Sequence, residues 1–214
     1  MLRRAENDVS CVEDRVVVEA PTEDDIAAFR DDVSVAIEQS DARNVRTLTA
    51  ETVVGAPVDA VWRTLTRYDA LDEFIPGLAV NECVETFEGG SILRQVGETK
   101  TGVGLTFKAN VLLRIEEHPK GLASTHRLFE YFGCPDEAMR DITLEQIEGD
   151  FKEFDGIWSM APGAEGNATT RLVYKLRVKP QPWLPIALVI RRVSWEVQTN
   201  LSCVRIEAER KSKC

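Results

Sequence analysis

One long amphipathic helix near the end of the sequence constrains the fold more than any other feature. Between about Pro185 and Arg210, apolar residues recur every three or four positions: Ile186, Val189, Ile190, Val193, Val197, Leu201, Val204 and Ala208. This spacing places them along one side of a helix of roughly 35 Å. An apolar side of that length must be covered by an extended apolar surface elsewhere in the chain.

The preceding sequence supplies such a surface as strands with alternating apolar and polar residues. The expected strands are Arg46–Val54, Leu78–Thr86, Ser91–Glu98, Leu105–Ile115, Ile142–Ile147, Phe151–Ala161 and Thr170–Lys179. Gly89-Gly90 marks a hairpin between two of them, and the other connections also suit antiparallel neighbours. We therefore predict an α+β fold, in which a curved antiparallel sheet of about six to seven strands wraps the long helix.

Two further regions complete the predicted organisation. Between the first two strands, residues 57–66 form a short amphipathic helix and residues 68–74 a second helical turn, which ends at Pro76-Gly77. Residues 1–43 read as an acidic, partly ordered N-terminal extension, with a short helix at about 23–30 and an extra strand at about 33–38. Residues 44–212 form the main domain.

The charge distribution excludes one class of partner. The net charge is −10, which argues against nucleic acid as the main partner because nucleic-acid binding needs a basic surface. Residues 1–43 carry a net charge of −7, whereas residues 171–214 carry +7. Five cysteines without a C-x-x-C pair suit a reducing compartment. No secretory signal or membrane-spanning run is visible, so we expect a soluble, non-secreted protein.

Three ordered blocks of sequence carry a family resemblance. They are Val54–Trp62 with Leu65–Asp69 and Phe74–Val80; Glu148–Phe151 with Phe154–Trp158; and Pro180–Pro185 with Asn200-Leu201. They resemble the polyketide cyclase/dehydrase branch of the START-like superfamily, which includes coenzyme Q-binding START-domain proteins. The third block is similar to cyanobacterial and plastid versions, so the resemblance implies a plastid or cytoplasmic location.

The resemblance implies a helix-grip fold with a cavity for a lipid, isoprenoid quinone, pigment or sterol-like molecule. The residues expected to surround this cavity are Trp62, Tyr68, Phe74, Phe107, Ala109, Val111, Trp158, Met160, Tyr174, Leu176, Val189, Val193 and Val197. Small inward residues such as Ala109 and Gly156 would leave room for a ligand. A fully packed core would use the same residues, so the pattern alone leaves both interpretations open.

Candidates for catalysis are few. His118 and His126 lie in or beside a polar connection, without metal-ligand spacing, and are expected at the surface. Asp150 and Asp155 are expected in a turn and on the solvated outer face of the sheet. We therefore predict no catalytic residue, metal or cofactor, and a non-catalytic carrier or chaperone of a hydrophobic molecule. The alternatives are an aromatase/cyclase that uses Tyr68, Tyr174 or an acidic side chain, and an assembly or scaffold protein.

The start of the long helix suggests a transient contact with an anionic membrane. Trp183 and Leu184 lie between two prolines, and Arg191 with Arg192 follows within two turns of helix. Tryptophan beside arginine suits an interface with anionic lipid. The alternative is that Trp183 fastens the start of the helix onto the sheet, and Trp195 could also mark a protein contact. The sequence does not predict the oligomeric state.

Overall fold

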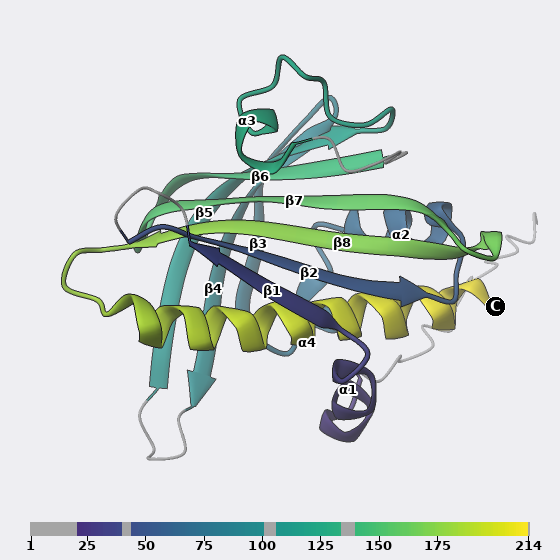
Figure 1. The fold of residues 1–214 in the computed structure, drawn as a ribbon, viewed down its shortest axis with the longest axis horizontal. Helices are drawn as coiled ribbons and strands as arrows, with labels where there is room; N and C mark the ends of the chain where they lie inside the picture. The colour runs from purple at the N-terminus through teal and green to yellow at the C-terminus, as the bar shows by residue number, and fades with distance from the viewer. Residues whose placement is uncertain (1–20, 40–43, 101–105, 134–139, 214) are drawn as a thin grey trace, which may run out of the picture.

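The computed structural model describes residues 21–39, 44–100, 106–133 and 140–213. The strands are β1 (Ser34–Gln39), β2 (Arg46–Val54), β3 (Leu78–Phe87), β4 (Gly90–Lys100), β5 (Thr106–His118), β6 (Arg140–Gly149), β7 (Phe151–Gly163) and β8 (Gly166–Pro180). The helices are α1 (Glu23–Arg30), α2 (Val58–Leu65), the 3-10 turn η1 (Leu71–Glu73), α3 (Phe129–Phe132) and α4 (Ile186–Ser212). All eight strands join in one antiparallel sheet in the order β1-β2-β8-β7-β6-β5-β4-β3 (Figure 1).

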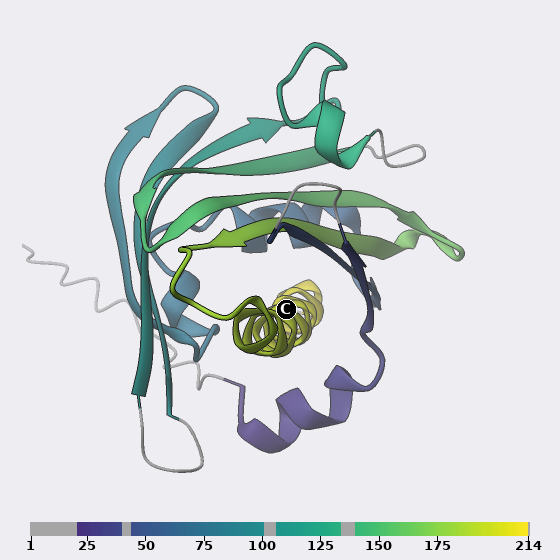
Figure 2. The same ribbon diagram turned by 60° about the vertical axis from the view of Figure 1, so that its left-hand side comes forward.

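The sheet curves around α4, which lies along its concave face (Figure 2). This arrangement confirms the predicted α+β helix-grip fold. The sheet has eight strands rather than six or seven, because β1 pairs with β2 and extends one edge. The interior is a single apolar cluster between the concave face, α2 and α4.

The two halves of α4 are buried to different extents. In the second half Leu201, Cys203, Val204 and Ala208 are fully buried between α2 and the sheet. In the first half burial is confined mainly to one stripe, and neighbouring positions such as Leu188 are exposed. Proline at position 185 caps this end without a side-chain hydrogen bond. The helix is therefore held firmly at its C-terminal half and only along one side at its N-terminal half.

The connection between β5 and β6 covers part of the convex face of the sheet. Leu122, Leu128 and Phe132 from this connection form a second small apolar cluster with Ile157 of β7. Asp155 lies on the convex face as expected, but the connection covers it and leaves it 6% exposed. The prediction that this aspartate would be solvated is therefore wrong, because the sequence did not show that a connection folds back over it.

The described part of the acidic extension lies against the main domain. Thr22 and Asp25 form a capping box at the start of α1. Arg205 of α4 pairs with Asp32 at 3.1 Å and lies over the ring of Phe29, 4.6 Å from its centroid. α1 therefore packs across α4 on the side that the sheet leaves uncovered (Figure 2).

Glu207 makes the stability of this arrangement sensitive to acid. It is 4% exposed and pairs with Arg67, Arg210 and Lys211 at 3.3, 2.6 and 2.8 Å. Burial raises the pKa of this carboxyl, but the hydrogen bonds of Lys211 and Arg210 outweigh burial and hold the pKa below its ordinary value of 4.5. The ionised carboxylate therefore stabilises the fold above about pH 4.5, and this contribution is lost as the pH falls below that value.

We expect Glu207→Gln to lower the free energy of unfolding at pH 7 by ~1–3 kcal/mol, because charge-assisted hydrogen bonds are replaced by neutral ones. The loss should shrink as urea unfolding is repeated at decreasing pH below 4.5. Glu73→Gln is a control, since Glu73 pairs with the same Arg67 but is exposed. An equal loss at pH 7 and pH 3.5 would contradict a role for the Glu207 charge.

Candidate ligand site between the sheet and helix α4

Two stacked aromatic rings form the centre of the concave face. Trp158 of β7 and Tyr174 of β8 are paired across neighbouring strands, and their ring centroids lie 4.0 Å apart at an interplanar angle of 11°. A Cβ on Gly156 would lie 3.2 Å from Cε2 of Tyr174 and 3.1 Å from the Lys175 carbonyl oxygen. Gly156 therefore lets the aromatic ring pack closely, and the expectation that it leaves room for a ligand is wrong.

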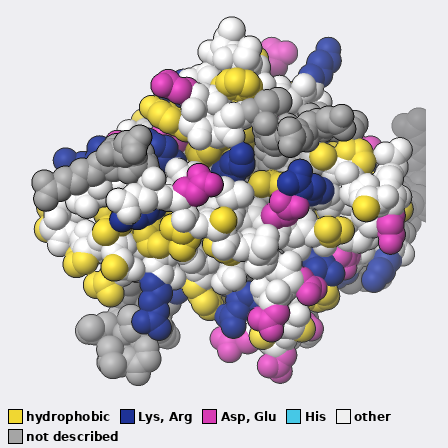
Figure 3. Space-filling model, viewed as in Figure 1, with side chains coloured by type: hydrophobic (Ala, Val, Ile, Leu, Met, Phe, Trp, Pro, Cys, Tyr) yellow, Lys and Arg dark blue, Asp and Glu magenta, His cyan; other side chains and the backbone are white. Residues whose placement is uncertain are grey.

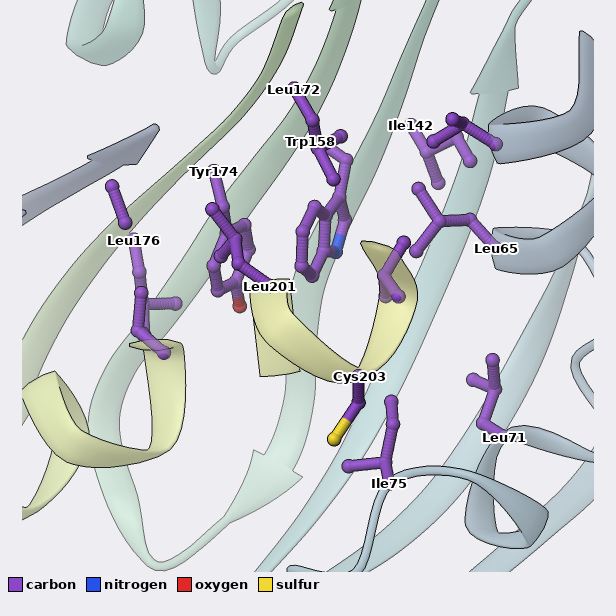
Figure 4. Packing of buried hydrophobic residues seen from close by; sticks show 14 of the residues in the cluster. Leu65, Leu71, Ile75, Ile142, Trp158, Leu172, Tyr174, Leu176, Leu201 and Cys203 are labelled. Atoms are coloured by element: carbon purple, nitrogen blue, oxygen red, sulfur yellow. The ribbon is translucent and has the colours of Figure 1, made fainter. Parts of the chain in front are cut away.

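The hydroxyl group of Tyr174 points from the sheet toward α4 (Figure 4). The residue is 5% exposed, and burial raises the pKa of the phenol well above its ordinary range, with a smaller contribution from the charge of Glu196. Among the described residues this hydroxyl makes no hydrogen bond. A hydroxyl that faces the helix from an apolar wall can donate a hydrogen bond to a bound molecule, so this atom is a candidate for contact with a ligand.

Small residues on β4 and β5 lie opposite the first half of α4. Gly97 and Ala109 are directly paired across the two strands. A Cβ on Gly97 would meet no atom closer than Oε1 of Glu196, at 3.9 Å. Glu196 in turn pairs with Arg192 at 2.6 Å. The concave face therefore accepts a small side chain at Gly97 without a clash, and it carries a charged pair on the facing helix.

A second polar group comes from the segment between α2 and η1 and meets the concave face at β5. The hydroxyl of Tyr68 donates a hydrogen bond to Glu117 at 2.9 Å, and Asn81 donates to the backbone carbonyl of Tyr68 at 2.8 Å. Burial and the negative charge of Glu117 raise the pKa of Tyr68 far above its ordinary value. This phenol therefore stays protonated at neutral pH, with its O–H donating to Glu117, and its oxygen can still accept a hydrogen bond.

The structure brings the sequence-predicted cavity residues to one cluster. Those buried in it are Tyr68, Phe74, Val111, Trp158, Met160, Tyr174, Leu176, Val189, Val193 and Val197, and those half-buried against it are Trp62 and Ala109. Phe107 belongs to β5, but its side chain lies outside the described residues. The residues of a packed core would form the same cluster as the residues that line a ligand cavity. The role of these residues as cavity lining therefore stays a prediction.

The start of α4 presents large apolar side chains to solvent. Trp183 is 79% exposed, Leu188 64% and Trp195 41%. Arg191 is exposed beside them, and the guanidinium of Arg192 lies 4.8 Å from the ring centroid of Trp195. Figure 3 shows hydrophobic side chains gathered over this end of α4, with Lys or Arg side chains next to them.

The exposure of Trp183 decides between the two interpretations of this tryptophan. A side chain that fastens the helix to the sheet would be buried, so that interpretation is wrong. Leu184 is half-buried and packs against the core in its place. Whether the exposed residues contact a membrane stays a prediction. None of the helices in the described ranges is long and apolar enough to span a bilayer.

A separate cavity of about 660 Å³ lies near the other end of α4. It is lined by Asp32, Thr52, Val53, Gly55, Arg205, Glu209 and Lys213. Five of these seven side chains are polar or charged. This cavity is therefore distinct from the apolar interior and does not contain the sequence-predicted residues.

Sequence reasoning did not predict which polar side chains contact one another. His118 and His126 were expected at the surface, but both are half-buried and their rings meet edge to face, with centroids 5.3 Å apart. The pairing of Tyr68 with Glu117 was also missed. These residues lie 8 and 49 positions apart, and no local spacing indicates such contacts.

The sequence matches the profile of the family described as "Polyketide cyclase / dehydrase and lipid transport" over residues 54–205. The chain belongs to this family. The match runs from the last residue of β2 through most of α4, and therefore includes most of the sheet and the facing helix. No curated protein matches the sequence closely enough to serve as a relative.

Solved structures show the same fold at low sequence identity. A STAR-related lipid transfer protein from Xanthomonas axonopodis is 14% identical with a TM-score of 0.63, over 83% of this chain and 93% of that one. The Zhui aromatase/cyclase from Streptomyces sp. R1128 is 18% identical with a TM-score of 0.59, over 78% and 95%. The human StarD13 lipid transfer and protein localization domain is 13% identical with a TM-score of 0.59, over 82% and 84%. These identities establish the fold alone.

Proposed function

We propose that this family member binds a hydrophobic small molecule between the concave face of the sheet and the first half of α4. The protein would act as a non-catalytic carrier or chaperone. The ligand class is a lipid or an isoprenoid quinone of the coenzyme Q type, and a plastid setting fits the resemblance of its third sequence block. Its family includes lipid transport in its description, and two of its structural neighbours are named for lipid transfer.

The observation that carries this proposal is the hydroxyl of Tyr174, which points toward α4 and makes no hydrogen bond among the described residues. A ligand carbonyl or hydroxyl that accepts from this group would recover the hydrogen bond, and the apolar remainder would lie along the small residues Gly97 and Ala109. Quinones and esterified lipids both combine a carbonyl oxygen with a long apolar chain. A ligand pocket with a few polar groups in an apolar lining is the ordinary form of such sites.

Native mass spectrometry of the purified protein tests the proposal. We expect a bound lipid or quinone that organic extraction releases. In Tyr174→Phe we expect the amount of bound ligand to fall at least ~5-fold, because one hydrogen bond of about 1 kcal/mol is lost. Tyr131→Phe is the matched control, since Tyr131 is exposed on the convex side. Recovery of a ligand-free protein that also fails to bind added ubiquinone or fatty acid would contradict the proposal.

The pairing of Tyr68 with Glu117 favours a second candidate, an aromatase/cyclase. A protonated phenol on the concave face could donate a proton to a poly-ketone substrate, and one structural neighbour is named as an aromatase/cyclase. Incubation with a reactive poly-ketone mimic distinguishes the two functions. If the native chain converts the mimic, and Tyr68→Phe abolishes this turnover without weakening binding, the protein is an enzyme. If the mimic binds without turnover, the carrier function is supported.

Loading from a membrane would use the exposed start of α4. We expect binding to anionic vesicles to weaken about five-fold in Arg191→Gln, because each cation near the surface contributes about 1 kcal/mol. Trp183→Ala should weaken binding further, and high salt should weaken only the arginine contribution. Lys213→Gln is the control, since it removes a cation from the far end of α4. Vesicle sedimentation measures these effects, and equal losses in all three variants would contradict a localised contact.

A further inference from the structure

A cluster of histidine and carboxylate side chains lies on the convex face of the sheet, on the side away from the candidate ligand site. Glu116 and His118 project from β5, Glu145 belongs to the neighbouring β6, and His126 belongs to the connection that covers this face. One possible ligand atom from each of Glu116, His118 and His126 lies within 4.8 Å of the others. All three residues are half-buried. The fold thus places His118 of β5 close to His126 of the connection, 8 positions away in the sequence.

The separations fit a metal coordination sphere better than hydrogen bonds. Nε2 of His126 lies 3.5 Å from Oε2 of Glu116 and 3.5 Å from Oε1 of Glu145. An N–H···O hydrogen bond is usually 2.7–3.2 Å long, so both contacts are loose. With metal–ligand bonds of about 2.0–2.2 Å, neighbouring ligands of a tetrahedral ion lie roughly 3.3–3.6 Å apart. Both contacts have this length.

Two arginines hold the carboxylates in place. Arg114 donates to Oε1 of Glu116 at 2.6 Å, and Arg127 donates to Oε2 of Glu145 at 2.5 Å. In each carboxylate the other oxygen is the one that faces His126. Such outer contacts orient metal ligands in known sites and also offset part of their negative charge. The cluster is therefore arranged so that one oxygen of each carboxylate is directed toward the imidazole.

We propose that Glu116, His118 and His126 form a binding site for a divalent transition-metal ion of the zinc class. Glu145 or a water molecule completes four-coordination. Two imidazoles with one or two carboxylates suit Zn²⁺, Co²⁺ or Ni²⁺ rather than Mg²⁺ or Ca²⁺, which prefer all-oxygen sites. The bound ion would join β5 to residues 119–133, and would therefore fix the connection on the convex face.

Metal binding requires two local changes. The backbone N–H of Leu128 donates to Nδ1 of His126 at 3.2 Å. A cation on Nε2 shifts the imidazole proton to Nδ1, so this long hydrogen bond must break. His118 contacts the Thr143 hydroxyl at 3.0 Å through Nε2, and its ring must either release that contact or bind through Nδ1. Movements of about an ångström are enough to reach metal–ligand distances.

Titration of the chelator-treated full chain with Co²⁺ tests the proposal through the visible absorption of the ion. We expect one Co²⁺ per chain in a four-coordinate spectrum without a thiolate charge-transfer band, which excludes the cysteines as ligands. His118→Gln and His126→Gln should each weaken binding at least ~10-fold. Glu153→Gln is the matched control, since Glu153 pairs with Arg177 and Lys179 elsewhere on the sheet.

Hydrogen exchange provides a second readout. Zn²⁺ should slow amide exchange in residues 119–133 of the native chain but not in the double variant His118→Gln/His126→Gln. Circular dichroism shows whether the variants fold. Stoichiometric Co²⁺ binding that persists in the double variant, or no stoichiometric binding by the native chain, would overturn the proposal.

Discussion

Leu201→Ala should lower the free energy of unfolding by about 2–5 kcal/mol, the usual range for a large-to-small change at a fully buried site. Leu201 has no exposed surface and lies in the half of α4 that is enclosed by α2 and the sheet. Figure 4 places it beside Tyr174, where the helix meets the sheet. The surrounding side chains come from elements on both sides and cannot all move to fill the space. Urea unfolding followed by circular dichroism measures the loss.

Leu188→Ala is the matched control for this effect. Leu188 lies on the same helix but is 64% exposed, so we expect a change within ~0.5 kcal/mol. A comparable loss in the two variants would show that α4 is held by its helical propensity rather than by its buried side.

Gly97→Leu and Ala109→Leu should each lower the affinity for a short-chain ubiquinone or a fluorescent fatty acid more than ~100-fold, equivalent to about 2.7 kcal/mol. The proposed ligand occupies the space opposite the first half of α4, and a leucine on either strand fills it. A Cβ on Gly97 meets no atom within 3.4 Å. The free energy of unfolding should therefore change by less than ~1 kcal/mol. Fluorescence titration measures the affinity and urea unfolding the stability.

Ala50→Leu distinguishes a cavity from a packed core. Ala50 faces the same interior from β2, paired with Tyr174, and has no exposed surface. Added methylenes at a packed position cost about 1–3 kcal/mol. If Gly97→Leu destabilises the protein as much as Ala50→Leu does, the interior is packed at both places. If the affinity stays unchanged in Gly97→Leu, the ligand binds elsewhere.

Local periodicity predicted the elements that build the candidate site. The alternation in β5 and β8 and the helical spacing in α4 each identify a buried side within one segment, without reference to any other segment. Tyr174 and Val193 were assigned to the interior in this way, and both are buried. The family resemblance supplied the expectation of a cavity, which periodicity cannot give, because a cavity and a packed core have the same apolar pattern.

The polar contacts could not be predicted in the same way. The hydrogen bond between Tyr68 and Glu117 depends on how the segment between α2 and η1 meets β5. The burial of Asp155 depends on the return of residues 119–133 over β7. Gly156 and Gly97 are both inward glycines, yet a Cβ on Gly156 would lie 3.1–3.2 Å from its neighbours, whereas a Cβ on Gly97 would meet no atom closer than 3.9 Å. Both positions are glycine, and only the neighbouring strands and α4 make their surroundings different.

The sequence by itself determined that a long one-sided helix and a series of alternating strands must bury their apolar sides together, because hydrophobic burial acts on periodic patterns within each segment. The tertiary structure alone decided where the polar and charged groups meet. It placed the Tyr174 hydroxyl beneath α4 and gathered Glu116, His118 and His126 on the convex face. Such contacts depend on positions to within about an ångström, and strand register and the path of connections set those positions.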